Sequence, residues 1–438
     1  MKNAIVPWNE PTGSVVPKNA STAVDIAQVA VNLSTRDQRQ IVSAFTSDSF
    51  EMMAGFVLNK ALSQLKRTLA SLGMAFVGEM LGRSDLNEDS VPTVSISDFE
   101  AITLARELGL VNSTDAKRLT QHLELLAHFD GLSPNGTDTE EMTREEALSF
   151  LRTCVNSILG RQGNIAPLEF MTFRAALESR TFKETDQEVH MLKSAPYFFK
   201  KTTLGILLAG CKTKSGAAFE HTLGNLVVLV PTLWPTLREA EKWSVGQAYA
   251  EVVSAGATPA VVALKKALSS VRGFDFVPES LRSQTFSAAA GSLITVHTAM
   301  NNFYNEPSAI SALAKLGSTI PWPAFPVCMS AILAVVLGNR YGRSNAAQAD
   351  ANELLGRLTS NQWDYYLNEC LQGDELVLQK LAWYQSTQIN WCELAKTYKL
   401  IGKSPKNKDV ARLLTAAEKA ELGGISSAAT KLLAAVTL

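Results

Sequence analysis

The stretch Tyr197–Gly216 reads YFFKKTTLGILLAGCKTKSG, and the prediction for the rest of the chain starts from it. Three aromatic residues and two lysines precede an apolar segment from Leu204 to Ala209, and a basic turn with Lys212 and Lys214 follows. Positive charge near the C-terminal end of a helix complements the helix dipole. The stretch therefore predicts a buried helix with lysines at both ends.

Helical patterns dominate the remainder of the sequence. Between residues 22 and 83, apolar residues recur at intervals of three and four, which is the period of an amphipathic helix. Ser97 with Glu100, and Thr143 with Glu146, form the capping-box pattern that begins a helix. The β-branched segment Leu223–Val230 is compatible with a strand or with a buried helix. We predict an all-α fold.

Length and composition suggest more than one domain. The chain has 438 residues, of which 46% are hydrophobic and 19% charged, so it can bury a large core. We expect two helical lobes, at 22–250 and 251–400. Residues 1–21, rich in proline and polar residues, predict an extended N-terminal arm that docks on its own body or on a neighbouring subunit. Residues 401–438 predict a basic connector followed by a tethered C-terminal helical arm.

Charge is unevenly distributed along the chain. The formal net charge is −1, yet residues 1–143 carry −7 and residues 144–438 carry +6. Lysine and arginine neutralise backbone phosphates, and aromatic rings stack on bases, so interleaved cations and rings suit single-stranded nucleic acid. The residues expected to contact RNA are Lys200, Lys201, Lys212, Lys214, Lys265, Lys266, Arg340, Tyr341 and Arg343.

Catalytic and metal-binding patterns are not found in the sequence. There is no H-E-x-x-H or G-x-S-x-G motif and no metal-ligand spacing, so we predict a non-enzymatic protein without metal or cofactor. Five widely spaced cysteines beside apolar residues predict reduced thiols. A helical ribonuclease that uses His122 or His221 remains an enzymatic alternative.

Two stretches carry a family resemblance. The apolar–basic–apolar pattern of Leu204–Val230, with CKTKSG in its middle, resembles the basic loop near the RNA cleft of nucleoproteins of non-segmented negative-strand RNA viruses. Phe325–Pro326, followed by a helix that ends in GNRYGR, is similar to a helix of that family's C-terminal lobe. The resemblance implies RNA clamped in a basic cleft between two lobes, homo-oligomers assembled through terminal arms, and a phosphoprotein or polymerase cofactor as partner.

Other classes of protein stay open at this point. An all-helical bacterial interaction subunit, for example of a defence complex, also fits the acidic front and the alanine-rich composition. The longest apolar run is too short to span a bilayer, and the first residues lack a signal-peptide pattern. We therefore expect no membrane partner and a cytoplasmic location, or the host cytoplasm or nucleus and the virion if the protein is viral.

Overall fold

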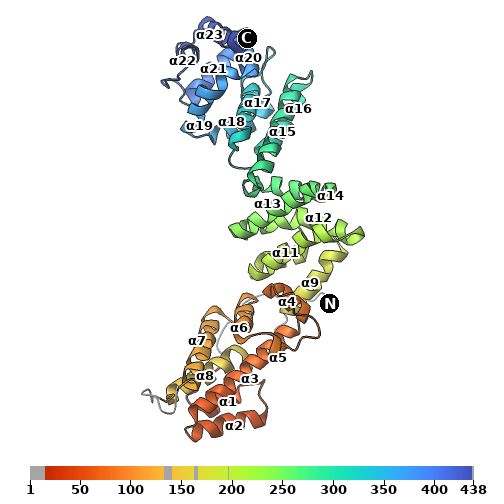
Figure 1. Ribbon diagram of the computed structural model, residues 1–438, viewed down its shortest axis with the longest axis vertical. Helices are drawn as coiled ribbons and strands as arrows, with labels where there is room; N and C mark the ends of the chain where they lie inside the picture. The colour runs from red at the N-terminus through yellow and green to blue at the C-terminus, as the bar shows by residue number, and fades with distance from the viewer. Residues whose placement is uncertain (1–14, 133–140, 162–165, 196, 437–438) are drawn as a thin grey trace. The chain divides into compact units, whose positions relative to one another are not determined.

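The computed structural model describes residues 15–132, 141–161, 166–195 and 197–436. All regular elements in these residues are helices, so the prediction of an all-α fold is confirmed (Figure 1). The one extended contact among them is an isolated bridge between Asn339 and Gly342. The segment Leu223–Val230, which the sequence left open, lies inside a helix.

The chain divides into two compact units, which are described separately below. Unit 1 is Met1–Thr236 and unit 2 is Leu237–Leu438. The boundary expected after residue 250 falls inside the unbroken helix α13, Glu239–Ser254. Helix α12 ends at Leu233, and the 3-10 turn Trp234–Thr236, which contains Pro235, follows it. A proline at this position interrupts the helix, which gives a physical reason for the division after Thr236.

Unit 1 contains helices α1 to α12. Their bounds are α1 (Ala23–Gln28), α2 (Thr35–Thr46), α3 (Phe50–Ala70), α4 (Met74–Leu81), α5 (Pro92–Ser95), α6 (Asp98–Glu107), α7 (Ser113–Asp130), α8 (Arg144–Cys154) with the π-turn η1 (Val155–Leu159), α9 (Ala166–Ser179), α10 (Gln187–Ser194), α11 (Tyr197–Thr213), α12 (Gly216–Leu233) and η2 (Trp234–Thr236).

Helix α3 is the centre of the first part of unit 1. It contacts α2, α6, α7 and α8. Its fully buried side chains are spaced by four residues and include Met53, Val57, Leu65 and Leu69. Both predicted capping boxes are present: Ser97 begins α6 and Thr143 begins α8. Local capping and one apolar stripe thus explain how these helices form and pack.

The N-terminal residues that the structure describes pack on their own chain. The amide of Val15 donates to Asn156 Oδ1 at 2.8 Å, and the side chains of Val16 and Ala20 are buried. Arg152 donates a hydrogen bond to the carbonyl of Ala20. Residues 15–21 of the predicted arm therefore dock on α8 and η1 of the same chain, whereas residues 1–14 lie outside the described residues.

Helix α12 holds the end of α9 and the residues after it through one buried side-chain amide, that of Asn225. Asn225 accepts from the amide of Phe182 at 2.8 Å and donates to the carbonyls of Leu177 and Arg180, each at 2.9 Å. All of these bonds are to backbone groups at the end of α9 and just after it. Because a buried amide is stable only when its hydrogen bonds are made, Asn225 fixes this segment on α12.

Unit 2 contains helices α13 to α23. Their bounds are α13 (Glu239–Ser254), α14 (Thr258–Ser270), η3 (Gly273–Phe276), α15 (Glu279–Thr298), α16 (Asn302–Ala314), η4 (Trp322–Ala324), α17 (Phe325–Leu337), α18 (Asn345–Gly356), α19 (Ser360–Tyr365), η5 (Tyr366–Cys370), η6 (Leu371–Gly373), α20 (Glu375–Trp383), α21 (Gln385–Thr397), α22 (Lys408–Glu418) and α23 (Leu422–Val436).

Helix α17 forms the core of unit 2. It is apolar on all sides, and it contacts α15, α18, α20 and α21. A helix without a polar face is stable only when it is surrounded by other helices. Nearly every residue of α17 is apolar, and ten of its thirteen residues are buried.

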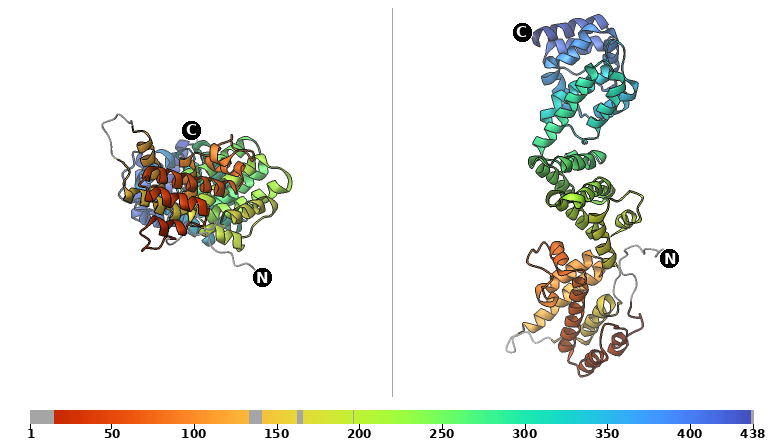
Figure 2. Two further views of the ribbon diagram at one scale, coloured as in Figure 1. Left: turned by 90° about the horizontal axis from the view of Figure 1, so that it is seen from below. Right: turned by 90° about the vertical axis from the view of Figure 1, so that its right-hand side faces the viewer.

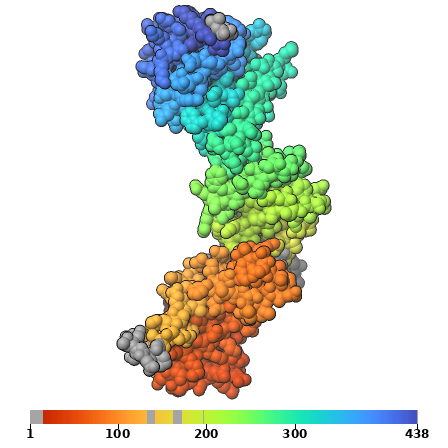
Figure 3. All heavy atoms as spheres, viewed as in Figure 1, coloured from red at the N-terminus to blue at the C-terminus, as the bar shows by residue number. Residues whose placement is uncertain are grey.

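The C-terminal segment joins the same core. Helix α23 packs against α20 and α22. The blue C-terminal residues lie together in the right view of Figure 2 and form one mass in Figure 3. In the connector, Lys403 Nζ lies 2.6 Å from Asp364 Oδ1. The segment predicted as a tethered arm therefore packs within unit 2, and its exchange between subunits stays a prediction.

Two glycines in unit 2 provide a matched test of how closely α13 packs against Phe276. At Gly246 of α13, an added Cβ would overlap the carbonyl oxygen of Phe276, whereas at Gly291 of α15 it would meet nothing within 4 Å. We expect Gly246→Ala to lower the free energy of unfolding by about 2 kcal/mol or more, because the helix must move away. Gly291→Ala should raise it by about 0.5–1 kcal/mol, as alanine favours a helix interior.

Urea unfolding followed by circular dichroism measures both effects. Equal changes in the two variants would contradict the close approach of α13 to Phe276.

Candidate functional site

The lysines of the opening stretch are not gathered at one point. Lys200 is buried in α11, and burial lowers the pKa of its amine. Lys201 is exposed beside it, whereas Lys212 and Lys214 lie about 18 Å further along, a distance given by the helical rise. Lys214 forms an ion pair with Glu178. The predicted RNA contacts in unit 1 therefore separate into two ends of α11, and one of the four lysines faces the interior.

The predicted contacts in unit 2 lie at two places. Lys265 of α14 lines a groove of about 730 Å³ together with Lys315, which directly follows α16, and Lys266 is exposed next to Lys265. Arg340 and Tyr341 lie on the turn between α17 and α18, where the guanidinium carbon is 4.5 Å from the centre of the tyrosine ring. Arg343, just after this turn, lies 3.4 Å from the carboxylate of Glu393.

The turn that carries Arg340 and Tyr341 is fixed by its backbone. Gly338 has a φ of +74°, and an added Cβ there would overlap the carbonyl oxygen of Gly342, so only glycine fits. The amide of Asn339 donates to Gly342 O at 2.8 Å, and the amide of Gly342 donates back to Asn339 O at 3.1 Å. Ser386 of α21 donates to the same Asn339 carbonyl at 3.0 Å.

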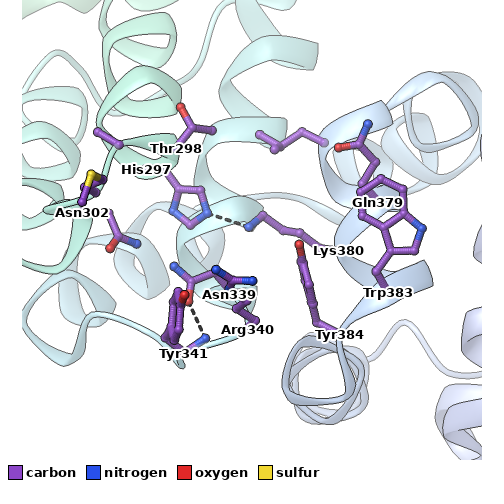
Figure 4. Close-up of a pocket in the computed structure, with 13 residues that line it drawn as sticks. His297, Thr298, Asn302, Asn339, Arg340, Tyr341, Gln379, Lys380, Trp383 and Tyr384 are labelled. Atoms are coloured by element: carbon purple, nitrogen blue, oxygen red, sulfur yellow. Dashed lines mark hydrogen bonds between the residues drawn. The ribbon is translucent and has the colours of Figure 1, made fainter.

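This turn forms one wall of a pocket of about 790 Å³ within unit 2 (Figure 4). The other walls are the end of α15, the start of α16, and α20 with the residue after it. The lining residues are His297, Thr298, Ala299, Met300, Asn302, Asn339, Arg340, Tyr341, Leu376, Gln379, Lys380, Trp383 and Tyr384. A cavity of this size with several polar groups has the dimensions of a small-molecule or nucleotide site.

A chain of three ionisable side chains runs from the pocket wall into the interior. Lys380 Nζ is 2.6 Å from His297 Nε2, and His297 Nδ1 is 2.8 Å from Glu306 Oε1. Figure 4 shows Lys380 and His297 pointing toward each other. Lys380 also donates to the carbonyl of Gly338 at 2.6 Å, and Asn302 donates to Glu306 at 2.9 Å. We call Glu306, His297 and Lys380 the relay.

Burial sets the charge state of the relay. All three side chains are buried, and burial lowers the pKa of Lys380 to about 8, although the Glu306 carboxylate opposes this shift. Lys380 and Glu306 carry groups of opposite charge that are joined through His297, so each can offset the charge of the other. A balanced set of buried charges avoids the large cost of an isolated buried ion.

A second buried network holds α20, and therefore Lys380, in place. Asp374, the residue before α20, accepts hydrogen bonds from Ser330 of α17 and Tyr366 of η5, each at 2.8 Å. It also accepts from the amide of Val377 at 3.2 Å, as an N-cap. Burial raises the pKa of Asp374 and raises that of the Tyr366 hydroxyl well above its ordinary value.

The two histidines of the ribonuclease alternative lie in helices of unit 1. His122 is buried, stacks on Phe150 with ring centres 4.0 Å apart, and lies 3.2 Å from Thr153 Oγ1. Burial lowers its pKa to about 4. His221 is half-buried on α12, with Nδ1 3.2 Å from Thr181 Oγ1. Hydroxyl partners and a neutral buried ring favour structural roles.

Sequence reasoning did not find the relay or Trp383. His297 and Lys380 are 83 residues apart, and Glu306 follows no motif that links it to either. The one usable signal was the GNRYGR turn, which identified Arg340 and Tyr341 but not the groups beside them.

Neither a metal-binding cluster nor a membrane-spanning helix occurs in the described ranges. No group of three or more histidine, cysteine, aspartate or glutamate side chains there is arranged to hold a metal ion. None of the helices observed in those ranges has both the length and the apolar character needed to cross a bilayer.

Comparison of the chain with protein-family models, curated proteins and solved structures finds no match.

The relay is testable as a coupled unit. Lys380→Met or Glu306→Gln alone should lower the free energy of unfolding by about 3–5 kcal/mol, because each change leaves the other group buried without its balancing charge. The double variant should lose less than the sum of the two losses, by more than about 1 kcal/mol. Urea unfolding of all four proteins completes the cycle.

The exposed pair Arg412–Asp409, 2.8 Å apart on α22, is the matched control. Its coupling should stay below about 1 kcal/mol. Additive losses at Lys380 and Glu306 would show that the two groups do not depend on each other.

His122 predicts a pH dependence of stability. Its folded pKa of about 4 lies below the ordinary histidine value of 6.5, so the unfolded chain takes up a proton first as the pH falls. Stability is therefore full above pH 6.5 and declines by up to about 3 kcal/mol as the pH falls to 4. His122→Phe, which keeps the stacking on Phe150, should remove this part of the slope.

The exposed His190 of α10 is the control, and His190→Gln should leave the slope as it is. Chemical unfolding at several pH values measures the slopes, and an unchanged slope in His122→Phe would contradict the buried neutral imidazole.

Proposed function

We propose that this chain binds single-stranded RNA through unit 2, with the 790 Å³ pocket as the principal contact. The observation that carries the proposal is the pair of exposed aromatic side chains at the pocket, Tyr341 and Trp383, which are 72% and 60% exposed. Large aromatic rings left in water at a polar pocket are typical of a binding site. Bases stack on such rings without regard to sequence.

Cations accompany the rings at this site. The Arg340 guanidinium lies over Tyr341, where it can contact a phosphate while it supports the ring. Lys380 lines the same pocket, where its charge is offset by Glu306 through His297. A ring for the base and a guanidinium for the backbone are the two components that binding of single strands requires.

A second positively charged surface lies beside α15 and α16, with Lys265 on α14 and Lys315 directly after α16. The groove with Lys265 and Lys315 is lined by α15 and α16, the helices whose ends also form the pocket. Hydroxyl groups of Ser269, Ser292 and Ser308 line the groove as well. Lysines and hydroxyls that follow a helix pair suit contacts with successive phosphates. We propose that the strand runs from the pocket along α15 and α16.

The contacts proposed for unit 1 are weaker. Lys200 is buried and Lys214 is ion-paired, so these two lysines are less suited to hold a phosphate than the exposed Lys201. Residues 15–21 and α23 pack on their own chain, so the described residues support RNA binding more than subunit exchange. Assembly of a nucleocapsid through terminal arms, with a phosphoprotein partner, is the further part of the proposal.

Fluorescence anisotropy of a labelled oligouridine tests the binding site. Tyr341→Ala and Trp383→Ala should each weaken binding by about 1–3 kcal/mol, because each removes a stacking surface. Arg340→Ala should also reduce the slope of log affinity against log salt by about 0.7, the value for one phosphate contact on a single strand.

Matched variants separate stacking from loss of structure. Tyr341→Phe keeps the ring and should bind as the original protein does, and Arg412→Ala removes an exposed arginine of α22 away from the pocket. No saturable binding of RNA by the original protein, with a low ratio of absorbance at 260 nm to that at 280 nm, would overturn the proposal and favour the interaction-subunit alternative.

A further inference from the structure

The relay is not explained by RNA binding. Contact with phosphate needs a positive charge at the pocket, and an exposed lysine would supply it. Here the amine is instead held 2.6 Å from an imidazole nitrogen, and that imidazole is held 2.8 Å from a carboxylate. A nucleophile beside a base that is oriented by a third group is the arrangement that activates side chains for covalent chemistry.

We propose that Lys380 is a nucleophilic amine that forms an imine with an aldehyde or ketone bound in the pocket, with His297 as its base and Glu306 as the positioning residue. This activity is independent of the RNA proposal, because it rests on the relay and not on the exposed rings.

The geometry assigns a role to each group. Lys380 is one of the residues that line the pocket, and its side chain points toward His297 (Figure 4). His297 Nε2 faces the amine, and its Nδ1 faces Glu306, which fixes the ring orientation and stabilises an imidazolium. Asn302 donates to Glu306 at 2.9 Å and holds that carboxylate in turn. The order of carboxylate, imidazole and nucleophile follows the logic of a catalytic triad.

The proton balance of the reaction can be written with these groups alone. The Lys380 ammonium gives one proton to His297 Nε2, and rotation about the Cε–Nζ bond turns the freed lone pair toward the carbonyl carbon. The C–N bond forms as the C–O π bond breaks, and a proton moves from nitrogen to oxygen to give a carbinolamine. The imidazolium then protonates the hydroxyl, which leaves as water, and a protonated imine remains.

The pKa of Lys380 supports this chemistry. Burial lowers it to about 8, so a substantial fraction of the amine is neutral near physiological pH. Desolvation of a lysine is one of the ways in which proteins make it nucleophilic. The titratable groups that line the same pocket are His297, Arg340, Tyr341 and Tyr384, and Glu306 lies behind His297.

The pocket also indicates the class of carbonyl compound. Arg340 offers a guanidinium for a carboxylate or phosphate, and the amide side chains of Asn302 and Asn339 line the same space. Trp383 and Tyr384 provide flat surfaces on the side of α20. The ligand that fits these groups is an aldehyde or ketone with one anionic group and a planar or apolar body.

Pyridoxal 5′-phosphate has all three features and serves as the probe. The full-length protein is incubated with it, reduced with borohydride, digested, and mapped by mass spectrometry. We expect the adduct to concentrate on Lys380, at least about 10-fold above the exposed Lys201, Lys265 and Lys266, and its rate to rise with a midpoint near pH 8.

Two further proteins keep the test decisive. Glu306→Gln keeps a side chain of the same size and should slow labelling of Lys380 about 10-fold or more, and circular dichroism checks that it remains folded. Arg340→Ala lies outside the relay and should weaken binding of the probe without moving the pH midpoint. Adducts spread over the exposed lysines with Lys380 unmodified, or labelling of Lys380 at equal rates with and without Glu306, would overturn the inference.

Discussion

Unit 2 depends on the carboxylate of Asp374. This one buried group accepts hydrogen bonds from η5 and from the first turn of α20, which are its neighbours in sequence, and from Ser330 of α17, which is 44 residues away. Helix α20 is therefore fixed relative to the core helix α17 by contacts that lie outside the pocket. Lys380 lies on α20 six residues after Asp374, and the precision of the relay derives from this connection. A loosely held α20 would not keep an amine 2.6 Å from an imidazole.

The two buried networks have different electrostatic characters. Asp374 accepts from two neutral hydroxyl groups and a backbone amide, and burial raises its pKa. The relay instead contains a carboxylate and an amine that balance each other through His297. The Asp374 network holds α20 on α17, and the relay holds the ionisable Lys380 at the pocket. Perturbed ionisable groups that also border a cavity mark functional sites more often than groups enclosed in a core.

The sequence predicted what local chemistry determines. Ser97 and Thr143 cap α6 and α8 as expected, and the apolar residues of α17 predicted a core helix, because caps and periodicity act within a few residues. The orientation of α11 could not be predicted, and for this reason Lys200 was taken as a surface residue although it is buried. The relay was missed because its members meet only through tertiary packing, across 83 residues between His297 and Lys380.

In the turn from Gly338 to Gly342, the residues that set the backbone differ from the residues that line the pocket. Its shape is set by two glycines and by hydrogen bonds of the backbone, and the side chains of Arg340 and Tyr341 point outward without packing in the core. Mutations at these two positions can therefore accumulate at little cost to the fold. Substitutions at these two positions would change the groups that border the pocket, while Gly338 and Gly342 keep the φ values of +74° and +122° that shape the turn.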